Sequence, residues 1–171
     1  MVPFGEVPVG LVVSAWDAVE PVFGLPCRTL APQPLPAAAL DAARGQYSSR
    51  LLLAELLRLA PAEARGALGV TEADLFLPVL TFVFGEAQLG GRAAVVSLCR
   101  LREELYLRPP QPVLLLARLR KEIVHELGHG FGLAHCRDER CAMRPSSTVG
   151  QTDAKNAALC FRCATLLGRT R

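Results

Sequence analysis

Long apolar runs, lysines and aromatic residues are all scarce in this sequence of 171 residues. The longest uncharged runs, such as residues 75–85, fall well short of the ~18 residues that a membrane-spanning helix needs, so we expect no membrane segment. The net charge of +3 comes from seventeen arginines and only two lysines, and aromatic residues make up 6% of the chain. The arginines are scattered or paired with glutamates and lack interleaved aromatic residues, so we expect no nucleic-acid partner.

The first residues lack the features of a secretory signal. Residues 1–6 carry no basic segment, and the apolar stretch after them is interrupted by Pro8 and Gly10 before Asp17. We therefore expect a cytoplasmic protein, in which thiols stay reduced and are available as metal ligands. A chain of this length with 51% hydrophobic residues fits one compact domain, and we expect a monomer.

All three histidines of the chain fall within residues 125–135. On a helix, His125 and His129 lie only about 40° apart and one turn apart in height, so both imidazoles can reach one metal ion. Glu126 lies about 60° round the helix from His129 and therefore flanks the ion without ligating it. This is the placement that a general base needs in order to take a proton from a water activated by the metal.

The third histidine, His135, reaches the same ion only if the helix breaks, because on a continuous helix it would lie ~15 Å beyond His125. Gly132 permits a sharp turn, since glycine adopts positive φ without a steric penalty. Three neutral imidazoles with an open fourth position are typical of catalytic zinc. The spacing H-E-x-x-H-x-x-G-x-x-H is that of metzincin peptidases. The alternative, histidines packed in a core without metal, does not account for this spacing.

Four cysteines form a second constellation immediately downstream. They occur as two close pairs, namely Cys136 and Cys141, then Cys160 and Cys163. This arrangement is typical of a structural four-cysteine zinc site, and the alternatives are two disulfides or inert buried thiols. The remaining thiols, Cys27 and Cys99, lie in apolar surroundings with no histidine to activate them, so we expect them to be buried and unreactive.

The whole run resembles the archaemetzincins, in which the metzincin histidine motif is joined to a four-cysteine zinc site around a methionine turn. The segments 44–47, 68–71, 82–87 and 97–101 are also similar to that family. The resemblance implies two zinc ions, a catalytic one on the three histidines and a structural one on the four cysteines, with Glu126 as base and Met143 in the turn beneath the catalytic site. It also implies that residues 1–132 and 133–171 form the N-terminal and C-terminal subdomains of one metallopeptidase domain.

Helical and strand patterns alternate along the chain and predict an α/β (α+β) fold. The expected architecture is a metzincin-like, mixed, mostly parallel twisted sheet with an antiparallel edge strand, an active-site helix and a small zinc-stapled C-terminal part. We expect strands at 7–15, 25–30, 74–78, 81–87 and 92–98, helices at 16–23, 47–59 and 112–131, and a proline-rich loop at 32–36. A last helix is expected to be capped by Thr152 and Asp153, to carry Cys160 and Cys163 on one face, and to end at Gly168.

These patterns predict a zinc-dependent peptidase that acts on peptide or protein substrates. In the family likeness, the strand at 81–87 is the sheet edge that pairs with an extended substrate, whereas the alternative is an ordinary edge covered by a loop. Two other function classes remain open. One is a catalytically silent or latent zinc-stabilised protein that binds peptides without cleaving them. The other is a nucleic-acid zinc module, against which the weak basic bias argues.

Overall fold

A four-stranded sheet forms the centre of the protein in the computed structural model, which describes residues 1–169. The strand order is β1 (Val2–Phe4), β4 (Ala67–Thr71), β7 (Ala93–Ser97) and β6 (Gly85–Ala87). The first three strands are mutually parallel, and β6 runs antiparallel to β7 at the edge. This confirms the predicted mixed, mostly parallel sheet with an antiparallel edge strand.

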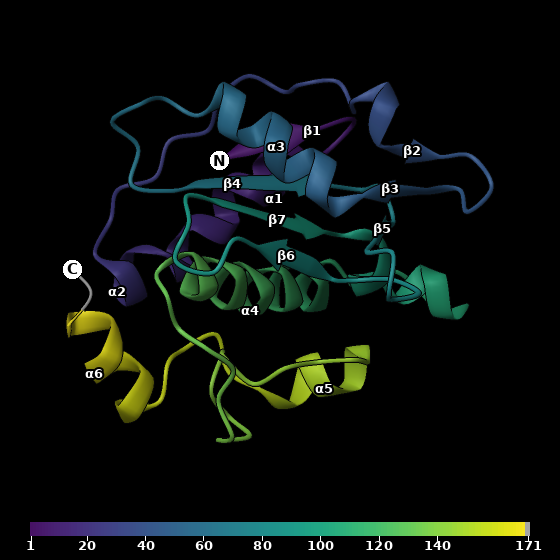
Figure 1. Ribbon diagram of the computed structural model, residues 1–171. Helices are drawn as coiled ribbons and strands as arrows, with labels where there is room; N and C mark the ends of the chain where they lie inside the picture. Colours follow the sequence, from purple (N-terminus) through teal and green to yellow (C-terminus); the bar gives the residue numbers. More distant parts are fainter. Residues whose placement is uncertain (170–171) are drawn as a thin grey trace.

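Helices cover both faces of this sheet, with α3 on one face and α4 on the other (Figure 1). The helices are α1 (Val9–Ser14), α2 (Glu20–Phe23), α3 (Ser49–Leu59), α4 (Pro112–Gly130), α5 (Val149–Ala154) and α6 (Phe161–Arg169). Short 3-10 turns lie at η1 (Ala15–Ala18), η2 (Ala37–Ala39), η3 (Cys99–Leu101) and η4 (Glu103–Tyr106). The elements α5 and α6 lie on the far side of α4 from the sheet (Figure 1). None of the helices in residues 1–169 is long and apolar enough to cross a membrane.

The apolar core has two parts because successive residues of a strand point to opposite faces. On β7, Ala94 and Val96 pack on the α4 side, whereas Ala93 and Val95 pack on the α3 side. The predicted leucine-rich helix at 47–59 is present as α3, and its buried residues Leu52 and Leu56 lie in the second part. The predicted helix at 112–131 is present as α4.

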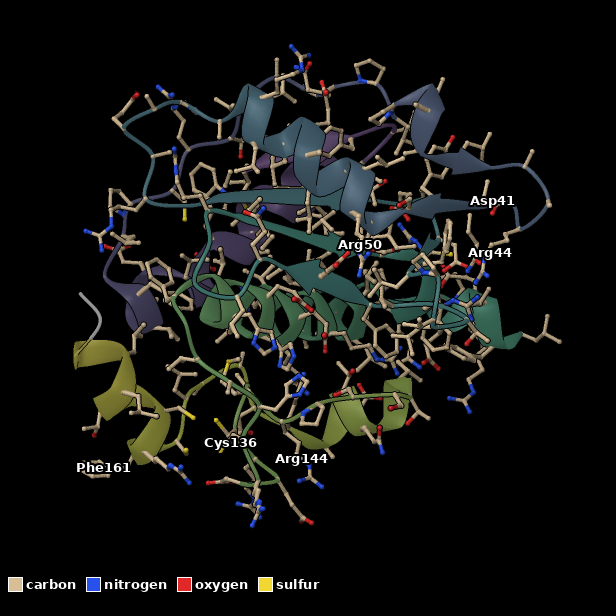
Figure 2. The ribbon with its side chains drawn as sticks, in the orientation of Figure 1. Asp41, Arg44, Arg50, Cys136, Arg144 and Phe161 are labelled. Carbon is tan, nitrogen blue, oxygen red and sulfur yellow. The ribbon has the colours of Figure 1, made fainter. Side chains whose placement is uncertain are left out.

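A second sheet, which the sequence pattern did not predict, supports the segment that leads into β6. It consists of β2 (Leu40–Asp41), β3 (Gln46–Ser48) and β5 (Leu75–Phe76), in that order. Beside it, Arg44 donates to the carbonyls of Leu80 and Thr81 at 3.0 Å each, and Gln46 also donates to Thr81. The segment at 44–47 therefore fixes the path of the chain towards the sheet edge; Figure 2 shows Arg44 at this end of the molecule.

Two predicted strands near the N-terminus are wrong. Residues 9–14 of the predicted strand at 7–15 form α1, because Pro8 precedes a helical turn and Val12 and Ala15 are buried with helical spacing. The first strand is β1 instead. The predicted strand at 25–30 is irregular, although Leu30 N–H donates to the Met1 carbonyl at 2.8 Å. The predicted proline loop at 32–36 is present.

The predicted last helix is also wrong, because the chain forms two helices there. Thr148, and not Thr152, accepts a hydrogen bond from a helix N–H, that of Gln151. Thr152 is instead buried inside α5, so its hydroxyl serves a tertiary contact described below. The second helix, α6, begins after Cys160, and Gly168 lies within α6 rather than ending it.

Candidate metal centre

Two imidazoles converge on one point because α4 is continuous through its last turn. His125 and His129 are one turn apart, and their Nε2 atoms lie 3.2 Å from each other. Two nitrogen atoms that both face one point at this separation are placed to share a ligand. The potential ligand atoms of His125, His129 and His135 all lie within 4.8 Å of one another.

The end of α4 brings the third imidazole into this group. Gly132 has φ of 85°, and its N–H donates to the His129 carbonyl, while the Leu133 N–H donates to the Gly128 carbonyl, both at 2.9 Å. These two bonds form the Schellman arrangement, in which a left-handed glycine reverses the chain. The turn expected at Gly132 is therefore present, and it carries His135 back towards the helix.

Backbone carbonyls set the tautomers of the two helical histidines. His125 Nδ1 lies 2.8 Å from the Ala142 carbonyl, and His129 Nδ1 lies 2.7 Å from the Leu133 carbonyl. A carbonyl only accepts, so each Nδ1 carries the proton and each Nε2 keeps its lone pair for a ligand. Burial lowers the pKa of His125 to about 2 and also lowers the pKa values of His129 and His135. Neutral imidazoles oriented in this way fit a zinc ion.

Glu126 lies beside this group and contacts the sheet edge. Its side chain is buried, and a Cβ added to Gly85 of β6 would lie 2.7 Å from the Glu126 Cγ and 2.6 Å from the Val95 carbonyl oxygen. Glycine is thus required at position 85 to let the carboxylate approach the strand. Burial raises the pKa of Glu126 well above its usual value, and the nearby carboxylate of Glu122 adds to that shift.

A cleft of about 460 Å³ opens over the histidines. One wall of the cleft consists of β6 and the segment before it, and residues 145–147 form a second wall. All three histidines and Glu126 line this cleft. The predicted site residues are therefore accessible to a ligand that enters between the two walls.

Met143 packs directly beneath α4. It is fully buried, and a Cβ added to Gly128 would lie only 2.3 Å from its sulfur atom. The residue before it, Ala142, supplies the carbonyl that faces His125. The methionine segment thus supports the histidine group both by packing and by a hydrogen bond. The spacing of the motif does not reveal the role of Gly128, which depends on this contact.

The sulfur atoms of Cys136, Cys141, Cys160 and Cys163 form a separate group, all within 4.8 Å of one another. The Cys136 and Cys160 sulfurs lie 3.8 Å apart, well above the length of a disulfide bond, and all four cysteines are free thiols. Four sulfurs at about 2.3 Å from a tetrahedral zinc would have edges of about 3.8 Å, so the spacing fits zinc. In Figure 2, sulfur atoms gather beside Cys136 and α6. Cys27 and Cys99 are partly buried, and burial raises their pKa values.

A buried ion pair next to the histidines was missed by the sequence analysis. Lys155 Nζ lies 3.0 Å from Glu122 Oε1, and the two side chains are 0% and 3% exposed. Glu122 precedes His125 by three residues on α4 and also lines the cleft. The sequence shows Lys155 only as one of two lysines, and no motif marks it.

Residues 25–169 match the family model described as Peptidase family M54. The chain is 42% identical over 161 residues to the archaemetzincin of Methanocaldococcus jannaschii, with 94% of this chain and 87% of the relative covered. The crystal structure of archaemetzincin from Methanopyrus kandleri superimposes with a TM-score of 0.83 at 39% identity, covering 99% of this chain and 92% of that one. A zinc-dependent peptidase from Methanocorpusculum labreanum superimposes with a TM-score of 0.87 at 29% identity, covering 97% and 98%.

Proposed function

The chain belongs to peptidase family M54, the archaemetzincins, which are zinc metallopeptidases, and we propose that it hydrolyses peptide bonds with Glu126 as general base. The observation that carries this proposal is the placement of Glu126. It shares a cleft with three converging imidazoles, yet it lies outside the histidine group that could hold a metal. A carboxylate in this position is available for proton transfer and is not required as a ligand.

His125, His129 and His135 would hold the catalytic zinc through nitrogen atoms that the structure already brings together. A zinc ion bound there would polarise the scissile carbonyl and lower the pKa of water to about 7. Glu126 would accept the proton released by the attacking water and pass it to the leaving amine. Its burial supports this role, because a carboxylate with a raised pKa is a better proton carrier near neutral pH.

The free edge of β6 supports binding of an extended peptide. Ser97 N–H donates to the Phe84 carbonyl and Gln88 N–H donates to the Ala93 carbonyl. The backbone groups of the even-numbered residues of this strand therefore point towards β7. In an antiparallel pair the alternate positions point outward, which leaves the backbone of Gly85 and Ala87 directed away from β7. We infer that a substrate strand adds at these two residues, one of which contacts Glu126.

We further propose that the four cysteines hold a second, structural zinc, giving two ions per chain. This ion would tie α6 to the methionine segment and hold residues 133–171 together as a C-terminal subdomain. Few large apolar residues are buried in that part, so a metal contributing on the order of 10 kcal/mol would compensate for its small core. Metal analysis of the purified protein tests the number directly, and one zinc per chain would contradict it.

The variant Glu126→Ala tests the catalytic proposal. Zinc-loaded protein should be screened against a peptide library and the variant compared on whichever peptide is cleaved. Turnover should fall roughly 10²-fold or more, which is the scale of general-base catalysis, while peptide affinity and zinc content stay unchanged. Turnover equal to that of the wild type would contradict the role of Glu126. Peptide binding with no cleavage by the wild type would instead favour a silent peptide-binding protein.

His129→Ala is the matched control, because it removes a proposed ligand rather than the proposed base. It should release one zinc and leave the zinc of the four cysteines in place. If Glu126→Ala also lost zinc, its loss of activity would not report on proton transfer.

A further inference from the structure

Lys155 is a fully buried cation beside the cleft. Its side chain is 0% exposed, and it has two partners, the Glu122 carboxylate at 3.0 Å and the Arg144 carbonyl at 3.2 Å. The hydroxyl of Thr152 donates to the same Glu122 oxygen at 3.1 Å. The pair is therefore well hydrogen-bonded on both sides.

A buried ion pair is weak evidence for stability, because removing both charges from water offsets most of their attraction. Well-packed apolar residues of similar volume stabilise a protein as much or more. The geometry instead indicates a positional role, since Lys155 joins α4, through Glu122, to the segment that follows Met143, through Arg144. Figure 2 shows Arg144 beside α5.

Residues 145–147 line the cleft immediately after Arg144. Pro145 and Ser147 are exposed, so this wall is not held by a core of its own. Its backbone is fixed at one end by Arg144, whose N–H donates to the Cys141 carbonyl at 2.9 Å and whose carbonyl accepts from Lys155. At the other end, Ser147 N–H donates to Gln151 Oε1 at 2.7 Å.

We propose that Lys155 is a positioning residue for substrate, which sets the cleft wall 145–147 through the Arg144 carbonyl. Glu122 anchors the ammonium to the helix that carries His125 and Glu126. The wall therefore keeps a fixed distance from the reacting groups. This inference rests on the proposed function, because the occupant of the cleft is taken to be a peptide.

The test uses three variants of the zinc-loaded protein. Lys155→Met alone leaves Glu122 buried without its cation and should lower the melting temperature. The double variant Glu122→Gln with Lys155→Met removes both charges and should recover most of that loss, while the Arg144 carbonyl still lacks its donor. Lys121→Met is the matched control. Its Nζ also donates to a backbone carbonyl, that of Asp153 in α5 at 2.9 Å, but Asp153 does not line the cleft.

Two zinc-binding inhibitors separate the wall from the metal. A peptidyl hydroxamate spans the cleft, whereas acetohydroxamate reaches only the ion. In the double variant, affinity for the peptidyl hydroxamate should fall roughly tenfold to a hundredfold, the equivalent of one lost hydrogen bond to a charged group. Affinity for acetohydroxamate should stay within about twofold of wild type, and Lys121→Met should leave both unchanged.

Hydrogen exchange of the amides of residues 146–148 supplies a readout that needs no ligand. Exchange there should accelerate in the double variant and not in Lys121→Met. Wild-type exchange and wild-type peptidyl affinity in a stably folded double variant would overturn the proposal. If wild-type protein bound both hydroxamates equally well, the peptide cleft itself would be refuted, and exchange at residues 146–148 would still decide whether Lys155 positions the wall.

Discussion

Gly128 and Gly130 are two residues apart on α4, yet their surroundings differ. A Cβ at position 128 would lie 2.3 Å from the sulfur of buried Met143, whereas at position 130 the nearest atom is a backbone oxygen 3.4 Å away. Alanine is a better helix former than glycine by about 1 kcal/mol. At position 128 packing outweighs helix propensity, because inserting a methyl group into a filled core costs about 1–3 kcal/mol of stability.

We therefore expect Gly128→Ala to destabilise the protein and to weaken the catalytic site. Displacement of Met143 would also move the neighbouring Ala142 carbonyl, which orients His125. Loss of such an outer contact typically costs 10–100-fold in metal affinity. Zinc titration and thermal unfolding measure both effects. Gly130→Ala is the control and should be neutral or slightly stabilising, and a similar loss in both variants would contradict the packing explanation.

Among the elements, α6 depends most on the proposed second zinc. It has nine residues, and only Cys163 and Leu167 are buried among residues 161–168. A helix this short is marginal by itself in water, so tertiary contacts must hold it.

Cys160→Ser should release one zinc and let α6 unfold locally. The thiol of Cys160 lies 3.8 Å from that of Cys136, so the change opens the group that joins α6 to the methionine segment. Hydrogen exchange in residues 161–168 should rise, and the melting temperature should fall. Cys99→Ser, which changes a thiol outside the group, should alter neither the zinc content nor the exchange of α6. Retention of two zinc ions by Cys160→Ser would be evidence against the four-cysteine site.

The helices and strands that could be predicted from the sequence are those whose form is set by residues close together in the chain. The helix α4 was predicted because its apolar stripe is local, and the chain reversal at Gly132 followed from one glycine. The strand predicted at 7–15 failed because β-branched residues such as Val12 and Val13 fit either a buried strand or a short buried helix. In the second sheet, β3 pairs with β5, which lies about thirty positions further along the chain, and each strand has only two or three residues. Strands this short leave no periodic signal.

The same reasoning applies to the candidate site. The three histidines follow one spacing motif and the four cysteines form two close pairs, so the sequence alone predicts the two groups that the structure brings together. Lys155 and Glu122 are 33 positions apart, and their pairing depends on how α5 packs against α4, which no local pattern records. Gly85 is likewise explained only by atoms of other elements, namely the Val95 carbonyl oxygen of β7 and the Glu126 side chain of α4.

At the scale of the whole molecule, the two groups that could hold metal ions share one stretch of chain. His135 and Cys136 are adjacent, and Cys136 N–H donates to the Met143 carbonyl at 2.9 Å. Ala142 N–H donates to the Ala158 carbonyl at 2.9 Å, while the Ala142 carbonyl faces His125. Folding of the C-terminal part and orientation of the proposed catalytic ligands are therefore linked. Proton uptake by both proposed ligand sets should appear in the stability of the whole protein.

The stability of zinc-loaded protein should fall with falling pH in two stages. In the folded state the four thiols and three imidazoles of the two groups would bind zinc without protons. In the unfolded state cysteine takes up protons below about pH 8.5 and histidine below about pH 6.5. The pKa values of the histidines are lowered by burial, so their contribution is present above pH 6.5 and is lost as the pH falls.

The slope of unfolding free energy against pH should therefore correspond to about four protons between pH 8.5 and 6.5 and approach about seven below pH 6.5. The three additional protons amount to roughly 4 kcal/mol per pH unit. Glu126 reduces this slope, because its raised pKa lets the folded state bind at most one proton that the unfolded state lacks. Urea unfolding between pH 8 and 5.5 at fixed free zinc measures the slope. A slope that does not steepen below pH 6.5 would mean that the folded protein already carries protonated histidines, which is incompatible with three imidazoles on one metal ion.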